Sequence, residues 1–310
     1  MSKDIENCLT IDVEDYFQVE AFSSIIAPED WQKYPCRVKE NVDNILNILN
    51  RLGVKATFFC LGWIAEHYPS VIRKIAEHGH EVASHGYAHR PIYKQTRAEF
   101  AQDIDRARKL LEDITGKQVL GYRAPTYSIT IKTIWALDIL IEQGYSYDSS
   151  IFPVHHDLYG IPDAPRFPFV IRKEQLEDIR LGKWPGNTLD FNSSLSTRSG
   201  AVADDDKIIE FPITSFRMGG VNLPVAGGGY FRLLPFWLTC RLLARINSDE
   251  GLPFVFYLHP WELDPEQPRI SAPIKSRIRH YLNLKRTEAR FNALVSRFSF
   301  APMAKVLGFM

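Results

Sequence analysis

Residues 56–83 read ATFFCLGWIAEHYPSVIRKIAEHGHEVA, and the order of elements in this stretch decides the fold. The run at 56–60 is rich in aromatic and apolar residues, which predicts a strand. Pro69 then opens an apolar pattern at helical spacing, Gly79 ends it, and a second strand is expected at 81–83. Strands that alternate with helices in this order predict parallel strands joined by crossover helices.

The same alternation continues along the chain in both directions. Further strands are expected at 9–11, 119–122, 145–148 and 253–258, and regular structure at 208–213. Further helices are expected at 38–52, 96–115, 134–143 and about 235–246. Gly53 and Gly116 are placed to end the first two of these helices. The fold class is therefore α/β.

Two segments depart from this regular pattern. Residues 152–207 are rich in proline, glycine and polar residues, with one expected strand near 167–170, and such a long irregular stretch usually shapes a rim or a lid. Residues 274–298 form a basic amphipathic pattern, which predicts one helix with a solvated outer face.

The overall composition gives no support to several classes of partner. The 310 residues include 37 Lys plus Arg and 37 Asp plus Glu, so the overall charge favours neither nucleic acid nor an anionic membrane surface. The four cysteines are scattered without metal-binding spacing and are interpreted as core thiols. The first residues show no apolar signal segment, and no later run reaches membrane-spanning length. These features predict a neutral substrate and a cytoplasmic setting.

His85 and His89 are the strongest candidates for a functional site. Two imidazoles four residues apart can face one ion if the segment turns helically after its strand, and a carboxylate from the distant cluster Asp12-Val13-Glu14-Asp15 would complete a metal site with open positions for water. The spacing alone is weak support, because paired histidines are more often surface or core residues.

The positions of other polar residues strengthen this hypothesis. Five of them come at or just after the end of an expected strand, namely Asp12, His85, Arg123, Asp148 and His259. In parallel α/β folds, catalytic groups converge at the carboxyl edge of the strands.

These residues resemble the motifs of carbohydrate esterase family 4, the metal-dependent polysaccharide deacetylases with a NodB homology domain. The matching segments, in family order, are Asp12-Val13-Glu14-Asp15, His85-Gly86-Tyr87-Ala88-His89, Arg123-Ala124-Pro125-Thr126-Tyr127, Asp148-Ser149 and Leu258-His259-Pro260. Segments at 12–22, 227–232 and 259–262 look more narrowly like the branch tied to bacterial exopolysaccharide biosynthesis. The resemblance covers nearly the whole chain.

The resemblance implies a fold and a cofactor. The expected fold is a single distorted (β/α)7-type barrel over residues 1–310, with the irregular segment 152–207 at its rim and a family-specific C-terminal part with helices at about 208–310. The expected cofactor is a divalent metal, Zn²⁺ first, with Co²⁺, Ni²⁺ and Mn²⁺ as alternatives.

Two departures from the family pattern concern the metal site. The family places its metal aspartate directly after its catalytic aspartate, but here Val13 intervenes. Strand alternation puts Asp12 and Glu14 on one side, yet the chain is leaving the strand, so both Glu14 and Asp15 remain candidate ligands beside His85 and His89. Gly86 also replaces the usual Ser or Thr.

The resemblance assigns a role to each remaining site residue. Asp12 would be the general base, and Arg123 would keep it ionised and oriented. The backbone N–H of Tyr127 would help to stabilise the oxyanion. His259 would protonate the departing amine, and Asp148 would hold its imidazole in the required tautomer.

The expected function is removal of N-acetyl groups from an N-acetylhexosamine-containing polysaccharide or its lipid-linked precursor. The expected partner is an N-acetylated glycan, without nucleic acid and without a transmembrane segment, and the oligomeric state is left open. Two alternatives remain, a hydrolase of the same fold acting on cyclic amides or ureides, and a catalytically silent glycan-binding protein. An aromatic rim and an open groove would favour sugars, whereas a small closed pocket would favour cyclic amides.

Overall fold

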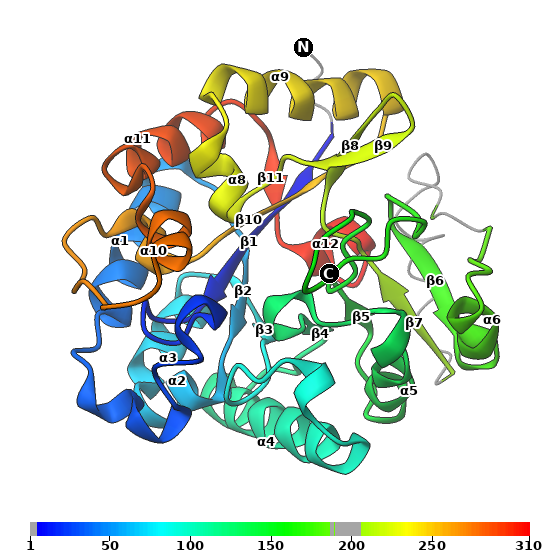
Figure 1. Cartoon of the computed structure of the whole chain (residues 1–310), viewed down its shortest axis with the longest axis horizontal. Coiled ribbons are helices and arrows are strands. Elements are labelled where there is room, and N and C mark those ends of the chain that lie inside the picture. Colours follow the sequence, from blue (N-terminus) through cyan, green and yellow to red (C-terminus); the bar gives the residue numbers. More distant parts are fainter. Residues whose placement is uncertain (1–4, 187–188, 190–205) are drawn as a thin grey trace.

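Seven parallel strands form the centre of the molecule (Figure 1). The computed structural model describes residues 5–186, 189 and 206–310. In sheet order the seven strands are β10 (Val255–Leu258), β1 (Asn7–Val13), β2 (Thr57–Cys60), β3 (Glu81–Ser84), β4 (Gly121–Tyr122), β5 (Tyr147–Asp148) and β7 (Lys207–Glu210).

Two further strands complete this sheet. β6 (Phe169–Arg172) pairs antiparallel with β7 at one end, and β11 (Phe300–Ala301) pairs parallel with β1. The hydrogen-bonded path runs from β10 to β6, so the barrel is open between these two strands. The predicted distorted (β/α)7-type barrel is confirmed in this form, a half-barrel of parallel strands surrounded by helices.

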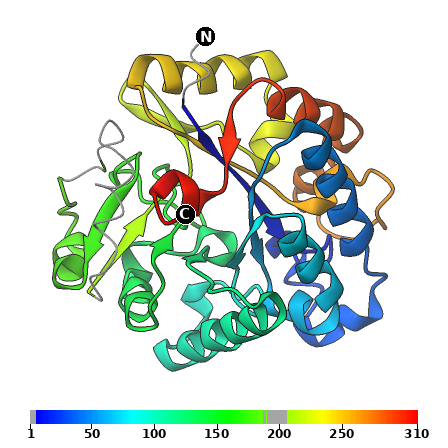
Figure 2. The same ribbon diagram turned by 180° about the vertical axis from the view of Figure 1, so that it is seen from behind.

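The crossover helices lie around the outside of the sheet (Figures 1 and 2). They are α1 (Val38–Leu52), α2 (Gly62–His67), α3 (Pro69–Glu77), α4 (Arg97–Thr115) and α5 (Trp135–Glu142). α1 ends at Gly53, whose φ of 67° is left-handed, as predicted. Thr96 and Glu99 form a reciprocal cap at the start of α4, which satisfies two backbone N–H groups that the helix leaves free.

Side chains alternate along β1 between two environments. Leu9, Ile11 and Val13 pack in the core shared with the helices, whereas Cys8 lies in a second core cluster. Because successive side chains of a strand point to opposite faces, Thr10 and Asp12 share the face of Cys8. This inner face therefore changes from apolar to acidic towards the carboxyl end of β1.

The C-terminal part contributes β10 and several helices. These are α8 (Gly228–Leu233), α9 (Phe236–Arg245), α10 (Ile274–Tyr281), α11 (Leu284–Val295) and α12 (Met303–Leu307). Figure 2 shows α12 over the centre of the sheet, on the side away from the viewer of Figure 1. A hairpin of β8 (Ser215–Met218) and β9 (Val221–Pro224) forms a separate two-stranded sheet.

One local prediction is wrong, and another is confirmed in part. The single helix expected at 274–298 is two helices, α10 and α11, because Asn283 is left-handed with φ 55° and its side chain donates a hydrogen bond to the Arg232 carbonyl. In the irregular segment 152–207, the strand expected near 167–170 is present as β6, whereas the short helix α6 (Leu176–Arg180) was not expected. Residues 187–188 and 190–205 of this segment lie outside the described part. No helix in the described ranges is long and apolar enough to cross a membrane.

Candidate active site

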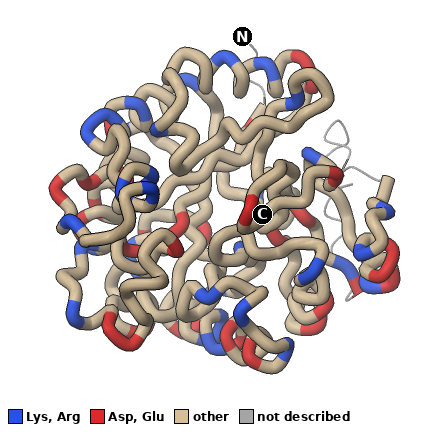
Figure 3. The backbone as a smooth tube through the Cα atoms, viewed as in Figure 1, with Lys and Arg blue, Asp and Glu red and all other residues tan. Residues whose placement is uncertain are grey.

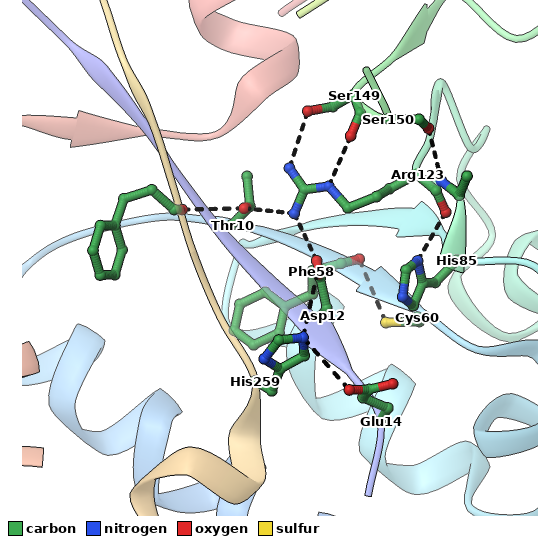
Figure 4. A network of polar contacts seen from close by, with 12 residues as sticks. Thr10, Asp12, Glu14, Phe58, Cys60, His85, Arg123, Ser149, Ser150 and His259 are labelled. Atoms are coloured by element: carbon green, nitrogen blue, oxygen red, sulfur yellow. Dashed lines mark hydrogen bonds and ion pairs between the residues drawn. The ribbon is translucent and has the colours of Figure 1, made fainter. Parts of the chain in front are cut away.

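Arg123 connects several strand ends beneath the site (Figure 4). It follows β4, is fully buried, and its guanidinium lies 2.6 Å from Asp12 Oδ1. The guanidinium also donates hydrogen bonds to the Thr10 hydroxyl and to Ser149. The backbone carbonyl of Arg123 lies 2.8 Å from His85 Nδ1. One residue therefore fixes both the predicted base and one predicted metal ligand.

Glu14, His85 and His89 form a cluster with metal-binding geometry. One ligand atom from each lies within 4.8 Å of the others, and all three residues are buried. His85 donates through Nδ1 to the Arg123 carbonyl, which leaves Nε2 with a free lone pair for a metal. Glu14 Oε2 lies 2.9 Å from His89 Nε2, yet no described group forms a hydrogen bond with it.

The electrostatics of this cluster suit a divalent metal. Burial opposes ionisation of Glu14, but the imidazoles of His89 and His259 overcome this effect and lower its pKa to about 2. Burial lowers the pKa of His85 to about 4. At neutral pH the carboxylate is therefore ionised and this imidazole is neutral, which are the states that metal binding requires.

The two histidines meet through a loop, and the helical turn that the spacing allowed is not formed. Gly86 and His89 have positive φ angles of 72° and 50°. A Cβ at Gly86 would lie 2.8 Å from Asp103 Oδ2, and that oxygen accepts the backbone N–H of Tyr87. The glycine in place of the family's hydroxyl residue is therefore required by both conformation and space.

Asp15 points away from the histidines. Its carboxylate accepts backbone N–H groups of Tyr16, Arg37 and Val38 at 2.8, 2.6 and 3.0 Å. It thus caps the start of α1 from a distant position in the chain. Of the two carboxylates that the sequence left open, the structure places Glu14 with His85 and His89, and Asp15 with α1.

His259 follows β10 and faces the same pocket. Its Nε2 lies 3.5 Å from Glu14 Oε1 and 3.9 Å from Asp12 Oδ2. Its Nδ1 lies 2.7 Å from Glu262 Oε1. Burial opposes the charged form, but the negative charges of Glu14 and Glu262 raise the pKa of His259 to about 9.

The predicted contact between Asp148 and His259 is absent, which corrects the role given to Asp148. Asp148 accepts a hydrogen bond from Ser150 at 2.5 Å and lies beside Glu210, and burial raises its pKa to about 6. Glu262 occupies the orienting position instead. It was missed in the sequence, although the spacing of His259 and Glu262 in the short helix Pro260–Leu263 could have indicated it.

Glu262 is itself held on its second oxygen. Arg232 Nε donates to Oε2 at 2.6 Å, and Arg232 Nη1 donates to the carbonyls of His280, near the end of α10, and of Leu282, between α10 and α11. Both Glu262 and Arg232 are buried. The C-terminal part thus builds the support for His259.

The backbone N–H of Tyr127 is already engaged, which corrects its predicted role. It donates to the Ala124 carbonyl at 3.0 Å. Thr126 and Tyr127 both have left-handed backbones, with φ angles of 58° and 51°. The tyrosine does line the pocket, but in this geometry its N–H is not free to bind an oxyanion.

Six of the nine predicted site residues line one small pocket beside a larger groove. The pocket has a volume of about 140 Å³, and its lining includes Asp12, Glu14, His85, His89, Tyr127, His259 and Trp261. It shares Val19, Glu20 and His89 with an adjacent groove of about 600 Å³. Trp31, Trp63 and Tyr87 contribute aromatic surface to this groove.

Two family models match separate regions of the chain. Residues 30–146 match the polysaccharide deacetylase family, and residues 191–308 match a domain of unknown function, DUF3473. Asp12 and Glu14 precede the first region, whereas His259 and Glu262 lie in the second. The site is therefore built from more of the chain than either match covers.

Comparison with known proteins gives relatives that are described as peptidoglycan deacetylases or as similar to them. The chain is 34% identical over 120 residues to a peptidoglycan deacetylase-like protein of Gibberella zeae, which covers 38% of this chain and 35% of that protein. It is 27% identical over 131 residues to the peptidoglycan deacetylase of Helicobacter pylori, covering 42% and 43%. The chain thus aligns with less than half the length of these relatives.

A solved structure supports the fold. A polysaccharide deacetylase-like protein of Mycobacterium smegmatis superposes with a TM-score of 0.55 over 99% of this chain and 91% of that one. The two sequences are 19% identical, so the similarity concerns the fold alone.

Proposed function

Because the chain carries a polysaccharide deacetylase domain of carbohydrate esterase family 4, we propose that it hydrolyses N-acetyl groups of an N-acetylhexosamine-containing glycan. The observation that carries this proposal is the shared pocket, in which a carboxylate pair meets three histidines, namely Asp12, Glu14, His85, His89 and His259. A glycan-binding protein without catalysis would not need this set of ionisable groups.

Glu14, His85 and His89 would hold a divalent metal, with Zn²⁺ as the expected ion. One carboxylate and two imidazoles form the donor set of many hydrolytic metal sites. When bound, the metal would supply Lewis-acid activation of the acetyl carbonyl and of water. The free lone pair of His85 and the position of Glu14 Oε2, 2.9 Å from His89 Nε2, support this assignment.

Asp12 is the general base in this proposal. Its Oδ1 is occupied by Arg123, whereas Oδ2 faces His259 across the pocket. An ionised carboxylate with one oxygen held and the other turned to the pocket can accept a proton from attacking water. Arg123 orients that carboxylate and balances its buried charge.

His259 is the general acid that protonates the departing amine. An amine is a poor leaving group unless it receives a proton as the carbon–nitrogen bond breaks. The carboxylate of Glu262 favours the charged imidazole and fixes its orientation through Nδ1, so that Nε2 points to the pocket. This arrangement gives Glu262 the positioning role that the sequence had assigned to Asp148.

The adjoining groove favours a glycan over a small cyclic amide. Aromatic side chains commonly stack on sugar rings, and the groove of about 600 Å³ has room beyond the reacting acetamide. The relatives described as peptidoglycan deacetylases support an N-acetylhexosamine substrate. The exopolysaccharide branch rests on the resemblance of residues 12–22, 227–232 and 259–262, and the cytoplasmic setting stays a prediction.

Acetate release from a panel of compounds tests the proposal. The panel contains N-acetylhexosamine oligomers of increasing length and a cyclic ureide, each assayed with and without a chelator. We expect acetate from the oligomers and loss of this activity on chelation. Ring opening of the ureide without acetate release would favour the cyclic amide hydrolase, and binding of oligomers without any turnover would favour the glycan-binding protein.

A further inference from the structure

The outer surface of α10 combines exposed isoleucines with cations. Ile274 is 73% exposed and Ile278 is 59% exposed. The two are four residues apart and therefore share one face of the helix, whereas His280 is buried on the opposite side. Lys275, Arg277 and Arg279 are also exposed. We refer to Ile274, Lys275, Arg277, Ile278 and Arg279 as the α10 surface.

The segment around this surface is strongly basic. Residues 269–287 contain no Asp or Glu and six cations, which are Arg269, Lys275, Arg277, Arg279, Lys285 and Arg286. Within the described ranges, none of the six forms an ion pair. Figure 3 shows blue segments of Lys and Arg at the place where Figure 1 labels α10. The balanced charge of the whole chain conceals this local excess.

The α10 surface lies beside the candidate active site. On its buried side, the His280 ring stacks on Trp261 at 4.1 Å, and Trp261 stacks on His259 at 5.3 Å. Partial burial lowers the pKa of His156, and the charges of Arg279 and Lys275 are among the causes, so these cations lie close to the loop that carries His156. The same loop exposes Leu158.

We propose that the α10 surface docks the protein on an anionic phospholipid bilayer. Exposed cations attract the phosphate-bearing headgroups, and two isoleucines at the outermost position of the helix can enter the boundary with the acyl chains. An anionic glycan or a nucleic acid would use the cations but would gain little from aliphatic side chains. Arg269 covers one face of the Tyr281 ring at 4.2 Å.

Docking would bring the site to glycans at the bilayer. This consequence rests on the proposed deacetylase function and favours the lipid-linked precursor over the finished polysaccharide as substrate. His259 is two stacked rings away from the buried side of α10, so the catalytic pocket and the docked surface lie on opposite sides of one helix. Binding to lipid does not itself depend on catalysis and can be tested separately.

Vesicle sedimentation tests the docking. The full chain is mixed with phosphatidylcholine vesicles, with or without phosphatidylglycerol. We expect binding only with the anionic lipid and weakening by salt. The double variant Ile274→Ser, Ile278→Ser should bind at least about tenfold more weakly, since buried apolar area contributes to interfacial binding. Lys275→Gln with Arg279→Gln should also weaken it.

A hairpin variant provides the matched control. Met218 and Val221 are 60% and 53% exposed at the turn between β8 and β9. Met218→Ser, Val221→Ser should therefore bind vesicles as the wild type does. Loss of binding in this control together with full binding by the isoleucine variant would overturn the proposal. Equal binding by the isoleucine variant and the wild type would also overturn it, because the aliphatic side chains would then contribute nothing to vesicle binding.

A second measurement separates docking from the proposed activity. The same N-acetylated oligosaccharide is presented free in solution or attached to a lipid in anionic vesicles. We expect the isoleucine variant to lose the preference for the lipid-attached form. Vesicle binding without acetate release from either form would contradict the deacetylase function and leave docking intact, whereas equal rates on both forms by the wild type would contradict the functional consequence of docking.

Discussion

Glu14 and Asp15 are adjacent acidic residues with different partners. Glu14 lies with His85 and His89, whereas Asp15 accepts backbone N–H groups at the start of α1. Glu14→Gln, and separately His85→Ala with His89→Ala, should therefore lose the bound metal, because each removes a donor of the cluster. Asp15→Asn is the control and should keep it. Metal analysis after dialysis measures the difference, and retained metal in the Glu14 variant would contradict this ligand set.

Asp12 is expected to be the general base and not a metal ligand. Asp12→Asn keeps the size of the side chain but cannot accept the proton of water, so turnover should fall about 10²-fold to 10⁴-fold. The variant should keep its metal and its fold, because Asp12 lies outside the metal cluster. Loss of metal together with activity would instead make Asp12 a ligand.

Glu262 is expected to act through His259. Removing its charge by Glu262→Gln lowers the pKa of His259, so the imidazole deprotonates at lower pH and the alkaline limb of the rate profile shifts towards acid. Both Glu262→Gln and His259→Ala should slow an acetamide far more than an activated aryl acetate, whose leaving group needs little protonation. Equal losses on both substrates would indicate a structural role.

The first turn of helix α1 is capped by a residue that is distant in the sequence. Asp15 follows β1, yet its carboxylate accepts the N–H groups of Arg37 and Val38. Asp15→Ala leaves the buried donor of Val38 and the partly buried donor of Arg37 without this partner and should lower the free energy of unfolding by about 1–3 kcal/mol. Denaturant unfolding measures this change. Asp30→Ala, at a partly exposed position, is the control, and an equal effect of both variants would argue against the cap.

Elements with strong local patterns were predictable from the sequence. Gly53 and Gly116 end α1 and α4, and the run at 56–60 forms β2, because backbone preference and apolar spacing agree there. The break at Asn283 was not predictable, since a hydrogen bond to the distant Arg232 carbonyl stabilises it. Elements shaped by distant contacts leave little local pattern in the sequence.

The site residues also divide into those that the sequence predicts and those that depend on distant contacts. Strand ends identified Asp12, His85, Arg123 and His259, because parallel strands bring their carboxyl ends to one edge. The partner of His259 depended on the short helix Pro260–Leu263, and the orientation of Asp15 depended on α1. The first set follows from topology, whereas the second depends on side-chain contacts that topology does not determine.

A buried histidine should make the whole molecule sensitive to acid. His80 Nδ1 accepts the N–H of Ala56 at 3.1 Å, and burial, with the charges of Lys55 and His78, lowers the pKa of His80 to about 3. In the unfolded chain His80 therefore takes up a proton near pH 6.5, whereas in the folded protein it stays neutral at this pH. The free energy of unfolding consequently falls as the pH decreases below 6.5.

The size of this effect can be measured. His80 alone should remove about 2 kcal/mol of unfolding free energy between pH 7 and pH 5. His80→Gln should flatten this dependence, and His155→Gln, at an exposed position, should leave it unchanged. An unchanged pH dependence in the His80 variant would show that other groups govern acid sensitivity.

The molecule assembles one site from distant parts of its sequence. Asp12 and Glu14 come from β1, the histidine pair follows β3, and His259 follows β10 in the C-terminal part. β10 pairs directly with β1, with Ile11 opposite Leu258, so His259 comes beside Asp12 through the sheet itself. The catalytic proposal therefore depends on the complete sheet.

The central claim is that a metal at Glu14, His85 and His89 and a base at Asp12 together hydrolyse an N-acetylated glycan. The most direct test titrates Zn²⁺ into metal-free protein and follows both bound metal and acetate release from an N-acetylglucosamine oligomer. Turnover should rise with bound metal and reach a plateau at one ion per subunit, while Asp12→Asn should bind the same amount with little turnover. Acetate release that is independent of bound metal, or equal in Asp12→Asn and the wild type, would contradict the claim.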